Sequence, residues 1–183
     1  MVYRNGTYIA FHAEGTPDPT ASDIKYFNIM KAWHEHDDIE FKFVNSHDKV
    51  SSVRDSSRKE TLRRSLVERL NVSRNFLLIV GTTTRFDTDW VPFEIAYAAD
   101  KCRLPFIIAY TGYRSILNPS ALSAIWPAAL ASRINSKTVS AIHVPFQRNA
   151  VDAAIRKFNL SNKPGGPLVC WTSEAHKQFG ISL

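Results

Sequence analysis

Short apolar runs alternate along the chain with segments in which apolar residues recur every three or four positions. The runs have the length of strands and the segments between them have the period of helices, which is typical of βαβ units. The predicted strands are residues 7–11, 39–44, 76–80, 105–110 and 139–145, and the clearest helices are 60–70, 89–102 and 149–158. This order predicts a flavodoxin-like, three-layer α/β/α fold with a central, mostly parallel five-stranded sheet, with residues 76–80 at its centre.

Turn-forming and polar residues divide the rest of the chain. Residues 45–59 are polar and predict a long loop, and Pro127 is expected to break residues 111–140 into two short helices. After a turn at 163–167, residues 168–171 are expected to form an edge strand. We expect one domain over residues 1–183, with a core at about 7–158, an insert at about 111–140 and a C-terminal tail at 159–183.

The composition limits the class of protein. The net charge of +6 and the pI of about 9.4 favour an anionic partner without defining one. Cys102 and Cys170 form no metal or disulfide pattern, and no apolar run follows Arg4 as in a signal peptide. The longest apolar runs are far shorter than the roughly 20 residues that cross a bilayer. We therefore expect a cytoplasmic protein with no membrane contact.

A crevice is expected where the predicted strands end. In parallel α/β sheets ligands bind at the carboxyl ends of the strands, which here brings together residues 11–14, 45–49, 81–86 and 110–113. Asp89 is a suitable N-cap for the following helix, and Glu94 lies one turn after Trp90 and one turn before Tyr97. Two interpretations of Glu94 remain open: a partly desolvated carboxylate between aromatic rings, or a solvated residue at the edge of an amphipathic helix.

Other chemistry-bearing residues have ordinary explanations. The histidines at 34 and 36 suit the end of a helix better than a metal site, and we expect no metal. His12 either contacts a ligand or packs beneath a loop. The basic residues between 54 and 69 alternate with acidic ones, which favours a solvated helix face over a nucleic-acid interface.

The stretch from residue 77 to 110 resembles a known family. An apolar strand, Gly81 and three threonines, Phe86, and then Trp90 followed by Glu94 and Ile95 resemble the core of TIR-like domains. The similarity is greatest to the bacterial branch typified by the TIR-like component of Thoeris anti-phage systems. The first strand ends in a Phe-His pair as in that branch, and Asn45-Ser46 resembles the loop after its second strand. The resemblance covers about residues 7–110 and continues more weakly to residue 158, and the chain departs from it at 111–140 and in its tail.

The resemblance implies an activity and a set of site residues. In enzymatic TIR domains the glutamate of this helix cleaves the nicotinamide–ribose bond of NAD, and here that residue is Glu94. The residues expected to bind the substrate are Phe11, His12, Ser46, Thr82, Phe86 and Trp90. NAD is then a substrate, hydrolysed or cyclised to a signalling nucleotide, and no cofactor is expected. The alternative is a non-catalytic TIR-like adaptor. Self-association through TIR-type contacts and an effector protein are the expected partnerships.

Overall fold

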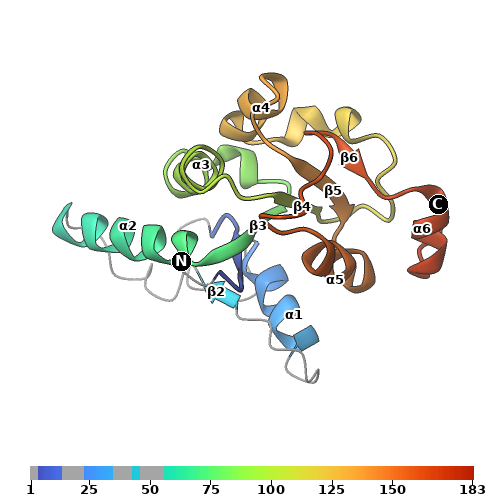
Figure 1. Cartoon of the computed structure of the whole chain (residues 1–183), viewed down its shortest axis with the longest axis horizontal. Coiled ribbons are helices and arrows are strands. Elements are labelled where there is room, and N and C mark those ends of the chain that lie inside the picture. The colour runs from blue at the N-terminus through green and yellow to red at the C-terminus, as the bar shows by residue number, and fades with distance from the viewer. Residues whose placement is uncertain (1–3, 14–22, 35–42, 46–55) are drawn as a thin grey trace.

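The computed structural model describes residues 4–13, 23–34, 43–45 and 56–183. Within them, six strands form one sheet in the order β2-β1-β3-β4-β5-β6, and every neighbouring pair is parallel (Figure 1). The first five strands confirm the predicted flavodoxin-like order, with β3 at the centre, and β6 adds a short edge within the expected residues 168–171. The strands are β1 (Gly6–Ala10), β2 (Phe43–Asn45), β3 (Ser73–Val80), β4 (Phe106–Tyr110), β5 (Ala141–Pro145) and β6 (Val169–Cys170).

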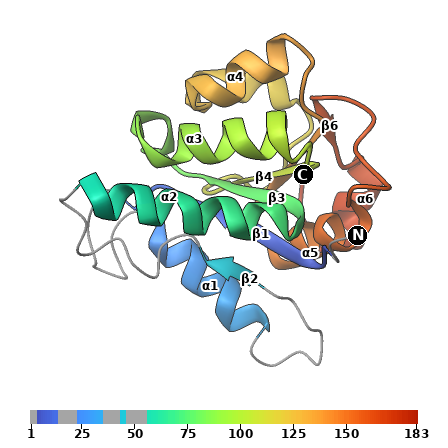
Figure 2. The same ribbon diagram turned by 60° about the vertical axis from the view of Figure 1, so that its left-hand side comes forward.

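Helices cover both faces of the sheet. One buried cluster joins the sheet to α2, α3 and α4, and a second joins the opposite face to α1 and α5. Figure 2 shows α3 and α4 on one side of the strands and α1 and α5 on the other, so the fold is a three-layer α/β/α sandwich. The helices are α1 (Ile24–His34), α2 (Ser56–Asn71), α3 (Trp90–Ala96), α4 (Ala128–Asn135), α5 (Arg148–Lys157) and α6 (Ser173–Gln178). None of the described helices combines the length and the apolarity that a bilayer-spanning segment needs.

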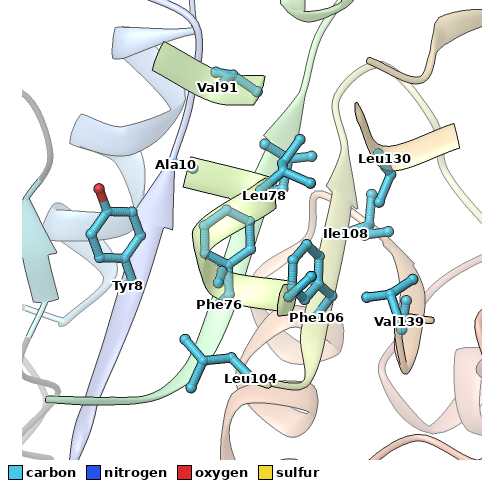
Figure 3. Close-up of a cluster of buried hydrophobic side chains, with 14 of the residues drawn as sticks. Tyr8, Ala10, Phe76, Leu78, Val91, Leu104, Phe106, Ile108, Leu130 and Val139 are labelled. Atoms are coloured by element: carbon cyan, nitrogen blue, oxygen red, sulfur yellow. The ribbon is translucent and has the colours of Figure 1, made fainter. Parts of the chain in front are cut away.

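Burial on both faces explains why the central strands have nearly unbroken apolar sequences. Every residue of Phe106–Tyr110 is buried, and so is every residue of β3 from Asn75 to its end. A parallel strand between two helical layers has no solvated face, so polar alternation disappears. On the α2–α3 face, Tyr8, Phe76 and Phe106 stand at equivalent register positions of three neighbouring strands. The ring centroids of Tyr8 and Phe76 are 5.6 Å apart, and those of Phe76 and Phe106 are 4.5 Å apart. Figure 3 shows these three side chains within the buried cluster.

Several boundaries differ from the sequence-based expectation. Helix α2 begins at Ser56, within the segment predicted as loop, and α3 continues into a π-helical turn, η3 (Tyr97–Lys101), before the predicted end at Cys102. The break at Pro127 is confirmed, because a 3₁₀ helix, η4 (Pro119–Ile125), precedes it and α4 follows. Helix α6 was not predicted. Its sequence is mostly polar, and it begins where the Thr172 hydroxyl accepts a hydrogen bond from the Ala175 N–H at 3.2 Å.

Candidate functional site

The site is built around the first turns of α3, which starts at the carboxyl end of β3. Asp87 Oδ1 accepts hydrogen bonds from the backbone N–H groups of Asp89 and Trp90, at 2.8 and 3.0 Å. The prediction that Asp89 caps this helix is wrong: its side chain makes no capping bond, and its φ and ψ of −114° and −72° lack the extended geometry of a capping residue. Its carboxylate instead forms an ion pair with Lys59 of α2 at 2.9 Å.

Glu94 lies on the inner side of α3 and is fully buried. It follows Val91 by three positions and precedes Ala98 by four, so it shares the stripe that packs against the sheet. The Tyr8 hydroxyl of β1 donates a hydrogen bond to Glu94 Oε1 at 2.6 Å, a length typical of a hydroxyl bonded to a carboxylate. The expectation that this carboxylate lines a solvent-reachable crevice is therefore wrong for the conformation described here.

The surroundings of the Tyr8–Glu94 pair keep the tyrosine protonated. Burial, followed by the negative charge of Glu94 and the hydrogen bond to it, raises the pKa of the Tyr8 hydroxyl well above its usual range, and Arg69 offsets part of this rise. Tyr8 also stacks on Phe76, with the two ring planes 10° apart. The donor is thus fixed by the sheet, and it holds the carboxylate in one position.

A cavity of ≈ 450 Å³ lies between α2 and α3, beside the turn that carries Glu94. Trp90 and Phe93 supply its aromatic wall, and the guanidinium of Arg63 lies 4.3 Å from the centroid of the Phe93 ring. The remaining lining residues are Lys59, Glu60 and Asp89. An aromatic wall suits a flat ring, and the two cations of the lining are matched by its two carboxylates. Glu94 is not part of the lining, since its side chain points to the inner side of the helix.

A buried hydrogen-bond network joins the ends of β1 and β3. Thr84 Oγ1 accepts from the Gly81 N–H at 2.7 Å and donates to Asp23 Oδ2 at 2.6 Å, and the Asp23 N–H donates to the His12 carbonyl at 3.2 Å. A Cβ atom on Gly81 would lie 2.1 Å from Asp23 Oδ1, so any other residue there would displace that carboxylate. This network fixes the turn at the carboxyl end of β3 and uses the Thr84 hydroxyl, while Thr82 stays exposed.

The other residues expected to bind a substrate are scattered. Phe11 is buried against Phe27 on the α1 face, opposite to Glu94, and is not placed to contact a ligand beside that carboxylate. His12 is partly buried. Phe86 is 61% exposed at the carboxyl end of β3, with the Arg85 guanidinium 4.6 Å from its ring centroid. Ser46 lies outside the described residues, as do residues 35–38 of the histidine-rich segment.

A second buried polar chain anchors the insert over β4 and β5. Trp126 Nε1 donates to the Tyr110 hydroxyl at 2.7 Å, and His143 Nδ1 lies 2.7 Å from the same hydroxyl. His143 Nε2 lies 2.9 Å from the Pro167 carbonyl oxygen, which only accepts, so Nε2 carries the proton and Nδ1 accepts from Tyr110. Burial lowers the pKa of His143 to about 4. In the described part of the chain, no three His, Cys, Asp or Glu side chains gather as metal ligands.

Tyr8 is not among the residues predicted for the site, although its position in the strand indicates a buried polar contact. Side chains alternate along a strand, so Tyr8 and Ala10 face one side of the sheet while Ile9 and Phe11 face the other. A tyrosine in a strand buried on both faces needs a partner for its hydroxyl. The inward stripe of α3 offers one polar residue, Glu94, on the same side. The two-residue period of the strand and the 3.6-residue period of the helix together predict a contact between Tyr8 and Glu94.

The sequence that forms this site also matches the model of a known protein family. Residues 8–115 match the family described as Thoeris protein ThsB, TIR-like domain. The match spans more than half of the 183 residues, from within β1 to just beyond β4. It includes Tyr8, Glu94 and all six residues that line the cavity between α2 and α3.

Proposed function

The chain belongs to the ThsB family of TIR-like domains, and from this premise we propose that it cleaves NAD at the nicotinamide–ribose bond with Glu94 as the catalytic carboxylate. The family gives the protein a TIR-like signalling role of the Thoeris defence type. The observation that carries the finer proposal is a carboxylate fully buried in the sheet-facing stripe of α3, 2.6 Å from the Tyr8 hydroxyl that donates to it. A role in packing alone would favour an apolar residue at this position, because burying a carboxylate is costly.

The chemistry of the bond suits a single carboxylate. Breaking the nicotinamide–ribose bond leaves positive charge on the ribose, as in glycoside hydrolysis. A negative charge fixed beside the ribose stabilises that transition state. Nicotinamide leaves as a neutral molecule, so the reaction needs no strong general acid. NAD is consumed as a substrate, and the product is a hydrolysed or a cyclised nucleotide.

The cavity between α2 and α3 is the place proposed for the dinucleotide. Trp90 would stack on one of its rings, and Arg63, which lies over the Phe93 ring, would turn towards its phosphates. Lys59 would have to leave its ion pair with Asp89 to do the same. Glu94 reaches this space only if its side chain turns outward or α2 shifts, since the carboxylate has no exposed surface in the described conformation. The proposal therefore includes a rearrangement, and self-association through TIR-type contacts is the event proposed to drive it. An effector protein would then respond to the nucleotide product.

The burial of Glu94 also favours a second candidate function. A carboxylate bonded to Tyr8 beneath α3 can serve to fix the position of that helix. In that case the domain is a non-catalytic adaptor, and its surfaces, not Glu94, carry the signal.

Glu94→Gln separates the two candidates. The amide keeps an oxygen that can accept from Tyr8 but loses the negative charge, so NAD cleavage should fall roughly a hundredfold to a thousandfold. NAD affinity should change much less, and the melting temperature should hold or rise slightly. Nicotinamide release is measured over a series of protein concentrations, because activity is expected to rise with self-association. Glu68→Gln makes the same change on the exposed face of α2 and should leave all three quantities unchanged.

Two outcomes would contradict the catalytic proposal. One is a folded Glu94→Gln protein that releases nicotinamide at the parent rate, which would remove Glu94 from the reaction. The other is a parent protein that releases no nicotinamide at any concentration while Glu94→Gln melts far below it. That combination would support the adaptor.

A further inference from the structure

A second cavity lies at the other end of the sheet from the turn that carries Glu94. Its volume is ≈ 290 Å³, and it opens between the loops that lead into β4 and β5, at their amino ends. Its lining combines hydroxyl, cationic and apolar side chains: Ala99, Asp100, Arg103, Leu104, Thr138, Val139, Ser140 and Lys163. None of these residues takes part in the proposed NAD chemistry.

The charges around this cavity are unequal. Its one acidic lining residue, Asp100, is occupied by Arg133, which donates to both carboxylate oxygens at 3.0 and 2.5 Å. The Arg133 guanidinium, first through its hydrogen bond, lowers the pKa of Asp100. No acidic group of the described chain pairs with Arg103 or Lys163. The Lys163 ammonium is held at the Arg103 carbonyl at 2.8 Å, which uses one of its three N–H donors.

The backbone places cations where glycine is preferred. Arg103 and Lys137 have φ values of 53° and 56°, and in the described residues they are the only non-glycine residues with positive φ. Each follows the end of a helix, where the next N–H reaches back to an earlier carbonyl: Leu104 to Ala98 and Thr138 to Arg133, both at 3.0 Å. Glycine is the usual residue at this position, and an L side chain costs about 1 kcal/mol there. Of these two residues Arg103 lines the cavity, and a strained position held by an arginine instead of glycine points to a use for that side chain other than folding.

We propose that this cavity binds a small phosphate monoester. Arg103 and Lys163 would hold the phosphate oxygens, with the guanidinium supplying a two-pronged contact. The Ser140 hydroxyl stands on the opposite loop and would donate to the same group, while the neighbouring Thr138 hydroxyl already lies 3.0 Å from Ser136 Oγ. Leu104 and Val139, which are 3% and 4% exposed, form an apolar floor for the organic part of the ligand. The site is independent of NAD cleavage and of Glu94.

Binding is tested with inorganic phosphate and phenyl phosphate, each titrated by calorimetry at constant ionic strength. Both should bind the full chain, and phenyl phosphate should bind more tightly because of the apolar floor. Arg103→Gly and Lys163→Met should each weaken phosphate binding at least about tenfold, the loss of about 1.4 kcal/mol of binding free energy. Arg103→Gly should not lower the melting temperature, since glycine removes the left-handed strain. Lys31→Met removes one exposed charge from α1 and should leave binding unchanged.

The variants also define the results that would overturn this inference. Phosphate binding that is equal in the parent, Arg103→Gly and Lys163→Met would exclude the cavity. Equal losses in Lys31→Met and Lys163→Met would mean that phosphate follows the net charge of the protein and not this site. A parent protein that binds neither phosphate nor phenyl phosphate would also refute the proposed site. If Arg103→Gly melts well below the parent, its side chain is structural, and Lys163→Met alone then decides the matter.

Discussion

Tyr8→Phe is the sharpest test of how Glu94 is held. The substitution keeps the ring that stacks on Phe76 and removes only the hydroxyl that donates to Glu94 Oε1 at 2.6 Å. A hydrogen bond to a charged group contributes about 1.5–3 kcal/mol, and both side chains are fully buried, so water cannot replace the lost donor. We expect the free energy of unfolding at neutral pH to fall by about 2 kcal/mol. For a chain of this size that corresponds to a loss of roughly 4–8 °C in melting temperature.

Urea unfolding of four proteins measures the coupling: the parent, Tyr8→Phe, Glu94→Gln and the double variant. Removing the charge should remove most of the cost of losing the hydroxyl, so the double variant should be more stable than Tyr8→Phe alone. A coupling of at least about 1 kcal/mol between the two positions is expected. Tyr97→Phe is the matched control, because its hydroxyl makes only a 3.5 Å contact with Asn71 near the surface. A Tyr8→Phe protein as stable as the Tyr97→Phe control would refute the reasoning.

Two further predictions concern stability away from α3. Gly81→Ala should lower the free energy of unfolding by roughly 2 kcal/mol, because the new Cβ would displace the buried carboxylate of Asp23. Gly165→Ala is the control and should have little effect, because nothing lies within 4 Å of the added atom. Equal melting temperatures for the two variants would contradict this prediction. Burial lowers the pKa of His143 to about 4, below its unfolded value of about 6.5, so its contribution is complete above pH 6.5 and is lost as the pH falls towards 4. We expect roughly 2 kcal/mol of this loss between pH 8 and pH 5, measured as a steeper pH dependence of urea unfolding in the parent than in His143→Phe; parallel pH dependences would contradict the assignment.

The central strands of the sheet could be predicted from the sequence, because burial on both faces makes a strand apolar throughout. A strand covered on both faces is apolar at every position, and residues 76–80 and 106–110 meet that description. The stripe of α2 was similarly predictable, since Leu62, Leu66 and Leu70 recur at helical spacing and are all buried. Helix α6 has no such apolar pattern. Its six residues are mostly polar, and its start depends on a side-chain cap that many loops also contain.

The site was predicted less well, because the sequence does not show which way the Glu94 side chain points. Sequence spacing placed Glu94 between Trp90 and Tyr97, but the helix is oriented by Val91 and Ile95, which are fully buried, and this turns Glu94 towards the sheet. Two aspartates stand before α3, and the choice between them depends on backbone angles that the sequence does not express. Tertiary packing, and not local pattern, settled both points.

The hydrogen bonds that link Trp126, Tyr110, His143 and Pro167 extend the folded unit beyond the residues that match the family. The family match stops at residue 115, yet Tyr110 lies in β4, and its hydroxyl is bonded to residues from the insert and from β5. A fragment cut at 115 would turn β4 into an open sheet edge of five residues that are all buried in the full chain. The segment that matches the family is therefore shorter than the segment that folds as a unit. Any grafting or swapping of this domain should carry residues up to at least 167, because the segment that identifies the family cannot shield its own core.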